Sequence, residues 1–222
     1  MINVHIIGSG FSSLSAACYL ASHGFQVTVF EKNDQFGGRA RQYIYEGFKF
    51  DMGPTWYWMP DVFERFFHDF GKQTTDYYEL SRLSPGYRVY FGENDYIDVE
   101  DSIDKIINTF ELIESGAAAK LKQFMEKAKS NYSIAIRNLV YNPGLSPLEL
   151  ITKDTVTNLK QFYFSIHDYV KKNFKDPRLQ QILEFPVLFL GAKPSKTPLF
   201  YSFMNYADFG LGTWYRGRTG AR

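Results

Sequence analysis

The chain has 222 residues, of which 45% are hydrophobic and 22% charged, so it is long enough to bury one large core or two small ones. Its 25 basic and 24 acidic residues nearly cancel, which excludes an electrostatic basis for nucleic-acid binding, and its single cysteine excludes an intrachain disulfide. The sequence has neither a charged leader nor an apolar run that could span a bilayer, so we expect a cytoplasmic protein.

The first thirty-one residues predict a strand, a glycine turn, a helix and a second strand. Residues 2–7 and 26–30 are apolar enough for buried strands, and between them lies the turn Gly8, Ser9, Gly10, Phe11, Ser12 and Ser13. Gly8 allows a tight turn, and Gly10 lets the backbone approach a diphosphate, whose charge the helix N-terminus favours. Glu31 follows Gly8 by 23 residues, close to the roughly 20 expected for the acid that takes the ribose hydroxyls.

This pattern predicts a dinucleotide-binding βαβ unit, although Ser13 stands where the usual motif has a third glycine. The alternative is a tight glycine turn of the kind found in any α/β domain. Two later segments favour the dinucleotide. Gly38 follows another glycine, with the donor fork of Arg39 directly after it, and Gly53 and Pro54 form a turn after a strand end. Taken singly, these features also fit a flexible hairpin approach and a solvated cation.

Further elements follow in chain order. We expect a helix over residues 61–70 with Asp61 as its N-cap, antiparallel strands over 76–98, and a helix that starts at Asp101 or Ser102 and runs to about 114. A longer helix is predicted over 117–141, and a helical pattern with breaks follows over 157–209. The four histidines show no metal spacing, so no metal site is expected.

Aromatic residues are unusually frequent, because Phe, Tyr and Trp make up 18% of the chain. A core rich in rings explains part of this, and a long apolar tunnel or a surface that sits in lipid explains it equally well. The run Lys171-Lys172-Asn173-Phe174-Lys175 is interpreted as a solvated helix end, with contact between the lysines and anionic headgroups beside an inserted Phe174 as the alternative.

The chain resembles the phytoene or carotenoid desaturase family of two-dinucleotide-binding flavoproteins. The resemblance covers about residues 2–215 and is carried by GSGFSSLSAA, VTVFEKNDQFGGRAR and FDMGPTWYWMPDVFERFF, and by the more particular run EFPVLFLGAKPSKTPLFYSFMNYADFGLGTWY at 184–215. It implies an α/β fold: a Rossmann-like FAD-binding βαβ unit with an added strand-and-helix domain for substrate and membrane, and with the C-terminal part of the family fold missing. FAD is the implied cofactor.

The resemblance also implies the site residues. Thirteen positions would bind FAD: Gly8, Ser9, Gly10, Phe11, Ser12, Ser13, Glu31, Lys32, Gly38, Arg39, Gly53, Pro54 and Thr55. The aromatic run Trp56, Tyr57 and Trp58 directly follows the turn placed beside the flavin, so we expect at least one of these rings to face the substrate. No residue is selected as the catalytic acid or base.

The implied activity is FAD-dependent desaturation of a carotenoid such as phytoene, by hydride loss from a lipophilic polyene to the flavin. Electrons would then pass to oxygen or a quinone, and the protein would contact the membrane peripherally. The alternatives are a carotene isomerase, a saturase, an amine oxidase, or an inactive fragment.

We divide the chain into a cofactor part over residues 1–75, a substrate-binding and membrane-associating part over 76–215, and a tail over 216–222. The tail is basic and lacks apolar periodicity, so we interpret it as an aberrant or disordered end that follows Tyr215.

Overall fold

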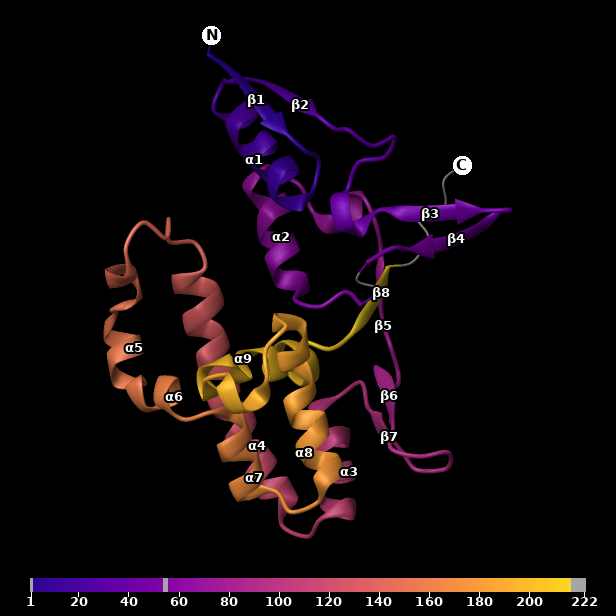
Figure 1. Cartoon of the computed structure of the whole chain (residues 1–222), viewed down its shortest axis with the longest axis vertical. Helices are drawn as coiled ribbons and strands as arrows, with labels where there is room; N and C mark the ends of the chain where they lie inside the picture. The colour runs from indigo at the N-terminus through magenta and orange to yellow at the C-terminus, as the bar shows by residue number, and fades with distance from the viewer. Residues whose placement is uncertain (1, 54–55, 217–222) are drawn as a thin grey trace. The chain divides into compact units, whose positions relative to one another are not determined.

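The computed structural model describes residues 2–53 and 56–216, and the chain divides into two compact units (Figure 1). Unit 1 draws on residues 1–57 and 68–72, and unit 2 on residues 58–67 and 73–222. The mixed α/β architecture confirms the predicted fold class.

The predicted βαβ unit is present in unit 1. Strand β1 (Asn3–Ile7) pairs in parallel with β2 (Gln26–Phe30), and α1 (Phe11–Ser22) makes the crossover between them (Figure 1). In each strand, exposed residues alternate with half-buried ones, and the half-buried set includes Val4 and Val27. This period of two matches a ladder with one face on α1 and the other open to solvent.

A hairpin completes the strands of unit 1. Strands β3 (Gln42–Tyr45) and β4 (Phe48–Asp51) pair antiparallel, and Glu46 and Gly47 form the two-residue turn at φ 47° and 83°. Two consecutive residues with positive φ are typical of the turn whose twist suits a tight hairpin.

Helix α2 (Pro60–Asp69) lies close to the predicted range but starts differently. The prediction that Asp61 is the N-cap is wrong, because Pro60 is already helical and Asp61 lies in the first turn. Proline is favoured there, since the first helical residue needs no N–H partner.

Four short strands lie in the part of unit 2 that the structure describes, and two of them form the predicted antiparallel pair. Strands β6 (Tyr87–Tyr90) and β7 (Tyr96–Val99) form a hairpin, whereas β5 (Leu80–Arg82) pairs antiparallel with the distant β8 (Trp214–Arg216). Arg216, the first residue of the predicted tail, therefore belongs to a strand. The rest of that predicted tail, 217–222, lies outside the described residues.

Helices supply most of unit 2. After α2 they are α3 (Ile103–Ile113), α4 (Ala117–Tyr132), α5 (Lys153–Thr157), α6 (Leu159–Tyr163), α7 (Ile166–Asn173), α8 (Pro177–Glu184) and α9 (Phe203–Asn205). The cap at Ser102 is confirmed, because its Oγ accepts a hydrogen bond from the Lys105 amide. The single helix predicted over 117–141 is wrong in part: α4 ends at Tyr132 and passes into a π-helical stretch over Ser133–Leu139.

The main core of unit 2 is rich in rings. Phe110, Phe174 and Phe209 are each 1% exposed, and Phe110 meets the other two edge-on at centroid distances of 6.1 and 6.5 Å. Rings in this arrangement add to the stability gained by burial. The alternative in which Phe174 inserts among lipid headgroups is therefore wrong, because its ring is in the core.

Candidate dinucleotide-binding site

The glycine turn between β1 and α1 is an open corner. Gly8 has φ +92°, and its amide donates to the Phe30 carbonyl at 2.7 Å. Gly10 is extended and stands directly before α1. A Cβ built on either glycine would meet no atom within 4 Å, so the missing side chains leave accessible backbone at this corner.

The carboxylate of Glu31 lies at this corner. Its Oε2 accepts from the Ser9 amide at 2.8 Å and from the Ser9 hydroxyl at 2.7 Å, while its Oε1 accepts from the amide and side chain of Asn33 at 3.0 and 2.7 Å. These hydrogen bonds, led by the one from the Ser9 hydroxyl, lower the pKa of Glu31 to about 2. Glu31 therefore stays ionised and connects the end of β2 to the glycine turn.

The second group of glycines brings three backbone segments together. The Gly37 amide donates to the Ser9 carbonyl at 2.8 Å, and a Cβ on Gly38 would lie 3.1 Å from the Cα of Gly10. A Cβ on Gly53 would lie 2.0 Å from the carbonyl oxygen of Arg39, which no real side chain permits. Gly38 and Gly53 are therefore glycines because backbone packs on backbone, a reason that the sequence motif alone does not reveal.

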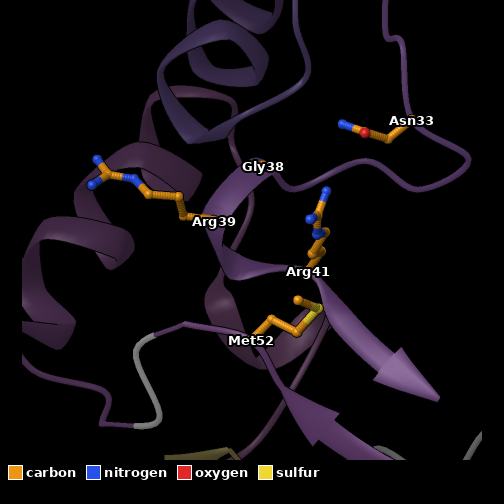
Figure 2. A pocket seen from close by; sticks show the side chains of 5 residues that line it. All are labelled: Asn33, Gly38, Arg39, Arg41 and Met52. Carbon is orange, nitrogen blue, oxygen red and sulfur yellow. The ribbon is translucent and has the colours of Figure 1, made fainter. Parts of the chain in front are cut away.

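A cavity of about 290 Å³ lies beside Gly38 and is lined by Asn33, Gly38, Arg39, Arg41 and Met52 (Figure 2). In Figure 2 the side chains of Asn33 and Arg41 point toward one another across this space, whereas that of Arg39 points to the other side of the backbone. The sequence motif indicated Arg39 but not Asn33 or Arg41, which also line this cavity. The repeated arginine in GGRAR was the signal that could have found Arg41.

The other predicted cofactor residues lie around the start of α1. Ser9 is buried, Ser12 and Lys32 are exposed, and Phe11 is 64% exposed. Ser13 lies half-buried in the first turn of α1, where no side-chain cap and no acidic residue occur among the described residues. Such a helix start attracts an anion through its unpaired amides and its dipole. Pro54 and Thr55 lie outside the described residues.

The corner therefore fits the diphosphate of a dinucleotide. It combines accessible glycine backbone with a helix N-terminus and places an ionised acid and an arginine nearby. Among the described residues, no group of three His, Cys, Asp or Glu side chains could hold a metal ion.

The aromatic run expected to face substrate is divided between the units. Trp56 and Tyr57 are half-buried residues of unit 1, and Trp58 is a half-buried residue of unit 2. The indole N–H of Trp58 donates to the Thr213 hydroxyl at 2.8 Å, and its ring meets Phe189 edge-on at 5.1 Å.

Comparison with known proteins supports the reading of unit 1. Residues 6–72 match the family model of the NAD(P)-binding Rossmann-like domain. The putrescine oxidase structure with putrescine bound gives a TM-score of 0.54 at 16% identity, over 97% of this chain and 46% of that one. Cyclohexylamine oxidase from Brevibacterium oxydans gives a TM-score of 0.53 at 20% identity, over 97% of this chain and 46% of that one. These structures show a shared fold.

Proteins found by sequence comparison have higher identities to this chain than these two structures do. The chain is 41% identical over 216 residues to the carotenoid 3,4-desaturase of Haloarcula japonica, which covers 96% of this chain and 44% of the relative. It is 31% identical to the 4,4'-diapophytoene desaturase of Staphylococcus haemolyticus, over 96% of this chain and 43% of that one. The zeta-carotene-forming phytoene desaturase of Myxococcus xanthus is also 31% identical, over 95% of this chain and 41% of that one. The chain thus spans less than half the length of these relatives.

Proposed function

We propose that the chain carries the FAD-binding and substrate-contacting elements of a carotenoid desaturase. The reason is that the chain is a homologue of the carotenoid and phytoene desaturases. The observation that carries this proposal is the 41% identity to a carotenoid 3,4-desaturase over 96% of the chain. The open glycine corner of unit 1 supports it independently, since a dinucleotide cofactor needs such a corner.

Unit 1 would hold FAD by its diphosphate and a ribose. The amides at the start of α1 and the backbone of Gly8 and Gly10 would face the diphosphate, and Arg41 would add a positive charge. All four acceptor positions of Glu31 are taken by Ser9 and Asn33, so ribose hydroxyls would replace the side-chain donors of these two residues. Bound FAD would supply the hydride acceptor for desaturation.

Unit 2 would contribute contacts for the lipophilic polyene through a set of rings that we name the aromatic wall, made of Trp58, Phe189, Phe185 and Tyr87. Neighbouring rings of the wall lie 5.1–5.6 Å apart, and Phe189 is 54% exposed. A hydrocarbon substrate offers no hydrogen-bonding group, so apolar contact must position it. Loss of a hydride leaves a delocalised cation, which a ring face stabilises by about 0.5–2 kcal/mol.

We also propose that the protein contacts the membrane peripherally from the cytoplasm, because its substrate is dissolved in lipid. No helix among the described residues is long and apolar enough to cross a bilayer. Unit 2 does expose large apolar side chains in one stretch of chain, with Leu145 at 87%, Leu148 at 71% and Tyr163 at 91%. Such residues suit contact with lipid. The reduced flavin would pass its electrons to oxygen or a quinone.

The main alternative is an amine oxidase of the same fold, since putrescine oxidase and cyclohexylamine oxidase are structural neighbours. Their identities of 16% and 20% support the fold and not the substrate. A carotene isomerase or saturase would share both the cofactor and the polyene.

A full-length chimera tests the proposal. Residues 2–216 would replace the matching segment of the Haloarcula japonica desaturase in cells that supply its carotenoid substrate, with the intact relative as control. We expect a product whose absorption lies at longer wavelength, because each desaturation extends the conjugated system. A chimera that binds FAD but forms no such product, or that instead oxidises putrescine and reduces oxygen to hydrogen peroxide, would contradict the proposal.

A further inference from the structure

A buried row of hydrogen bonds in unit 2 connects Trp58 to Tyr87 through two polar side chains. The indole of Trp58 donates to Thr213 Oγ1 at 2.8 Å, and this hydroxyl donates to Asp208 Oδ1 at 3.4 Å. The phenol of Tyr87 donates to Asp208 Oδ2 at 2.5 Å. Trp58 precedes α2, Asp208 lies in a π-helical turn over Tyr206–Gly210, and Tyr87 starts β6, so the row joins segments far apart in the sequence.

The same two end residues are also joined through rings. Trp58 meets Phe189 at 5.1 Å, Phe189 meets Phe185 at 5.4 Å, and Phe185 meets Tyr87 at 5.6 Å between centroids. The aromatic wall and the polar row therefore form a closed ring of contacts. Its polar side is buried, with Asp208 and Thr213 each 3% exposed, while Phe189 on the aromatic side is 54% exposed.

Burying the polar side of this ring of contacts costs free energy, because the carboxyl group of Asp208 is removed from water. Burying a carboxyl group disfavours its ionised form, and burial raises the pKa of Asp208 to about 7 despite the hydrogen bonds from Tyr87 and Thr213. The backbone beside Trp58 is also unusual, because Met59 has φ +57°, a left-handed conformation that residues with side chains rarely adopt. Features of this kind concentrate where a side chain is held for function.

We propose that Asp208, acting through the Thr213 hydroxyl, is a positioning residue that fixes the indole of Trp58 within the aromatic wall, on the side that receives the polyene. The inference rests on the proposed function for its substrate and on the hydrogen-bonded row for its geometry. The indole has one N–H donor, so a single acceptor at a fixed place sets the rotation of the ring. Thr213 presents that acceptor because its hydroxyl hydrogen is directed to Asp208 Oδ1, which leaves the oxygen lone pairs toward the indole.

Two variants of Thr213 separate positioning from packing. Thr213→Val keeps the shape and removes the acceptor, whereas Thr213→Ser keeps the hydroxyl and removes a methyl group. The chain would be labelled with 5-fluorotryptophan, and the fluorine resonance of Trp58 assigned by its loss in Trp58→Phe. Circular dichroism would verify that each variant folds.

We expect Thr213→Val and Asp208→Asn to shift or broaden the Trp58 resonance, and Thr213→Ser to leave it within its wild-type line width. An unchanged resonance in both Thr213→Val and Asp208→Asn would overturn the proposal, and so would an equal shift in Thr213→Ser. If the first two variants fail to fold, the comparison of Thr213→Ser with Tyr87→Phe decides it. Tyr87→Phe removes the other donor to Asp208 and should move the resonance, whereas Thr213→Ser should not.

Product formation by the chimera described above gives the functional half of the test. We expect Thr213→Val to lower the turnover of the chimera at least several-fold. Thr213→Ser should retain most of the turnover, because it keeps the hydroxyl. If Thr213→Val shifts the Trp58 resonance but leaves the turnover of the chimera unchanged, the proposal that this indole positions the substrate is overturned. A chimera that is inactive without any of these variants contradicts the proposed function instead, and the fluorine spectra of the chain are independent of that outcome.

Discussion

The glycines of unit 1 fall into two classes that the sequence motif does not distinguish. At Gly8 and Gly10 a Cβ would project into open space, which leaves backbone accessible to a ligand. At Gly53 a Cβ would collide with the Arg39 carbonyl, and at Gly38 it would lie in tight contact with the Cα of Gly10. Substitution at Gly10 should therefore affect ligand binding alone, whereas at Gly8 the φ of +92° adds backbone strain, and in the second class substitution affects the fold itself.

The charge of Glu31 is expected to contribute to the affinity for FAD. The change Glu31→Gln removes the charge that accepts from Ser9 and would accept from a ribose, so we expect FAD affinity to fall about 10-fold or more, as loss of a charged hydrogen bond implies. Because the pKa of Glu31 is lowered to about 2, its charge is constant from pH 5 to 8 and should add no pH dependence to binding there.

Titration of FAD fluorescence against the chain measures this effect, with Asp34→Asn as the matched change at an exposed carboxyl group of the same loop. Equal affinities for Glu31→Gln and Asp34→Asn would show that the charge of Glu31 has no part in binding.

The sequence could predict the corner more readily than the cavity beside it. Gly8, Gly10 and Glu31 stand at fixed spacings around one turn, so local geometry brings them together. Arg41 and Met52 are instead brought to the cavity by the β3 and β4 hairpin and by the close approach of Gly53 to Arg39. Such contacts between segments leave no periodic signal in the sequence.

Elements whose partners are local in sequence were predicted well. The β1–α1–β2 unit, the β6–β7 hairpin and the Ser102 cap of α3 each depend on neighbours within the chain. The partner of β5 could not be predicted, because β8 lies more than 100 residues away and is only three residues long. The π-helical stretch after α4 was missed because its residues continue a helical pattern.

The π-helical turn that carries Asp208 gives a prediction on stability. The folded chain retains the Asp208 proton up to about pH 7, while an unfolded carboxyl group releases it near pH 4, so the folded state binds more protons between these values. The free energy of unfolding should therefore fall as pH rises from 4 to 7, by on the order of 4 kcal/mol from this group, and stay level above.

Asp208→Asn should remove that contribution, so the stability of the variant relative to wild type should increase from pH 5 to pH 8. Urea unfolding followed by circular dichroism at both pH values measures it. Burial and the neighbouring Asp208 raise the pKa of Tyr87 well above its ordinary value, so this phenol stays neutral over the range and does not mask the effect. A stability difference that is the same at both pH values would mean that Asp208 is ionised in the folded chain.

At the scale of the whole molecule, the two units differ in how completely they bury their apolar residues. Unit 2 has an extensive core, whereas Ile7 is 90% exposed and Phe30 is 52% exposed in unit 1. Within the described ranges the β1–β2 ladder has two strands, and a two-stranded ladder is marginal without further cover. The chain also spans less than half the length of its relatives. We therefore expect FAD, which would cover the corner of unit 1, to raise the midpoint of thermal unfolding.

If the Gly8–Gly10 corner holds the diphosphate of FAD, a substitution at this corner must weaken FAD binding, and titration of the chain with FAD measures that loss. Gly10→Ala is compatible with the backbone at φ −73° and meets no atom, so we expect an unchanged thermal midpoint and an FAD affinity at least 10-fold weaker. Gly92→Ala, whose Cβ would make an ordinary contact with Asp95, should bind as the wild type does. If Gly10→Ala binds FAD as tightly as Gly92→Ala, or if the chain binds none, the assignment of the diphosphate to this corner is contradicted.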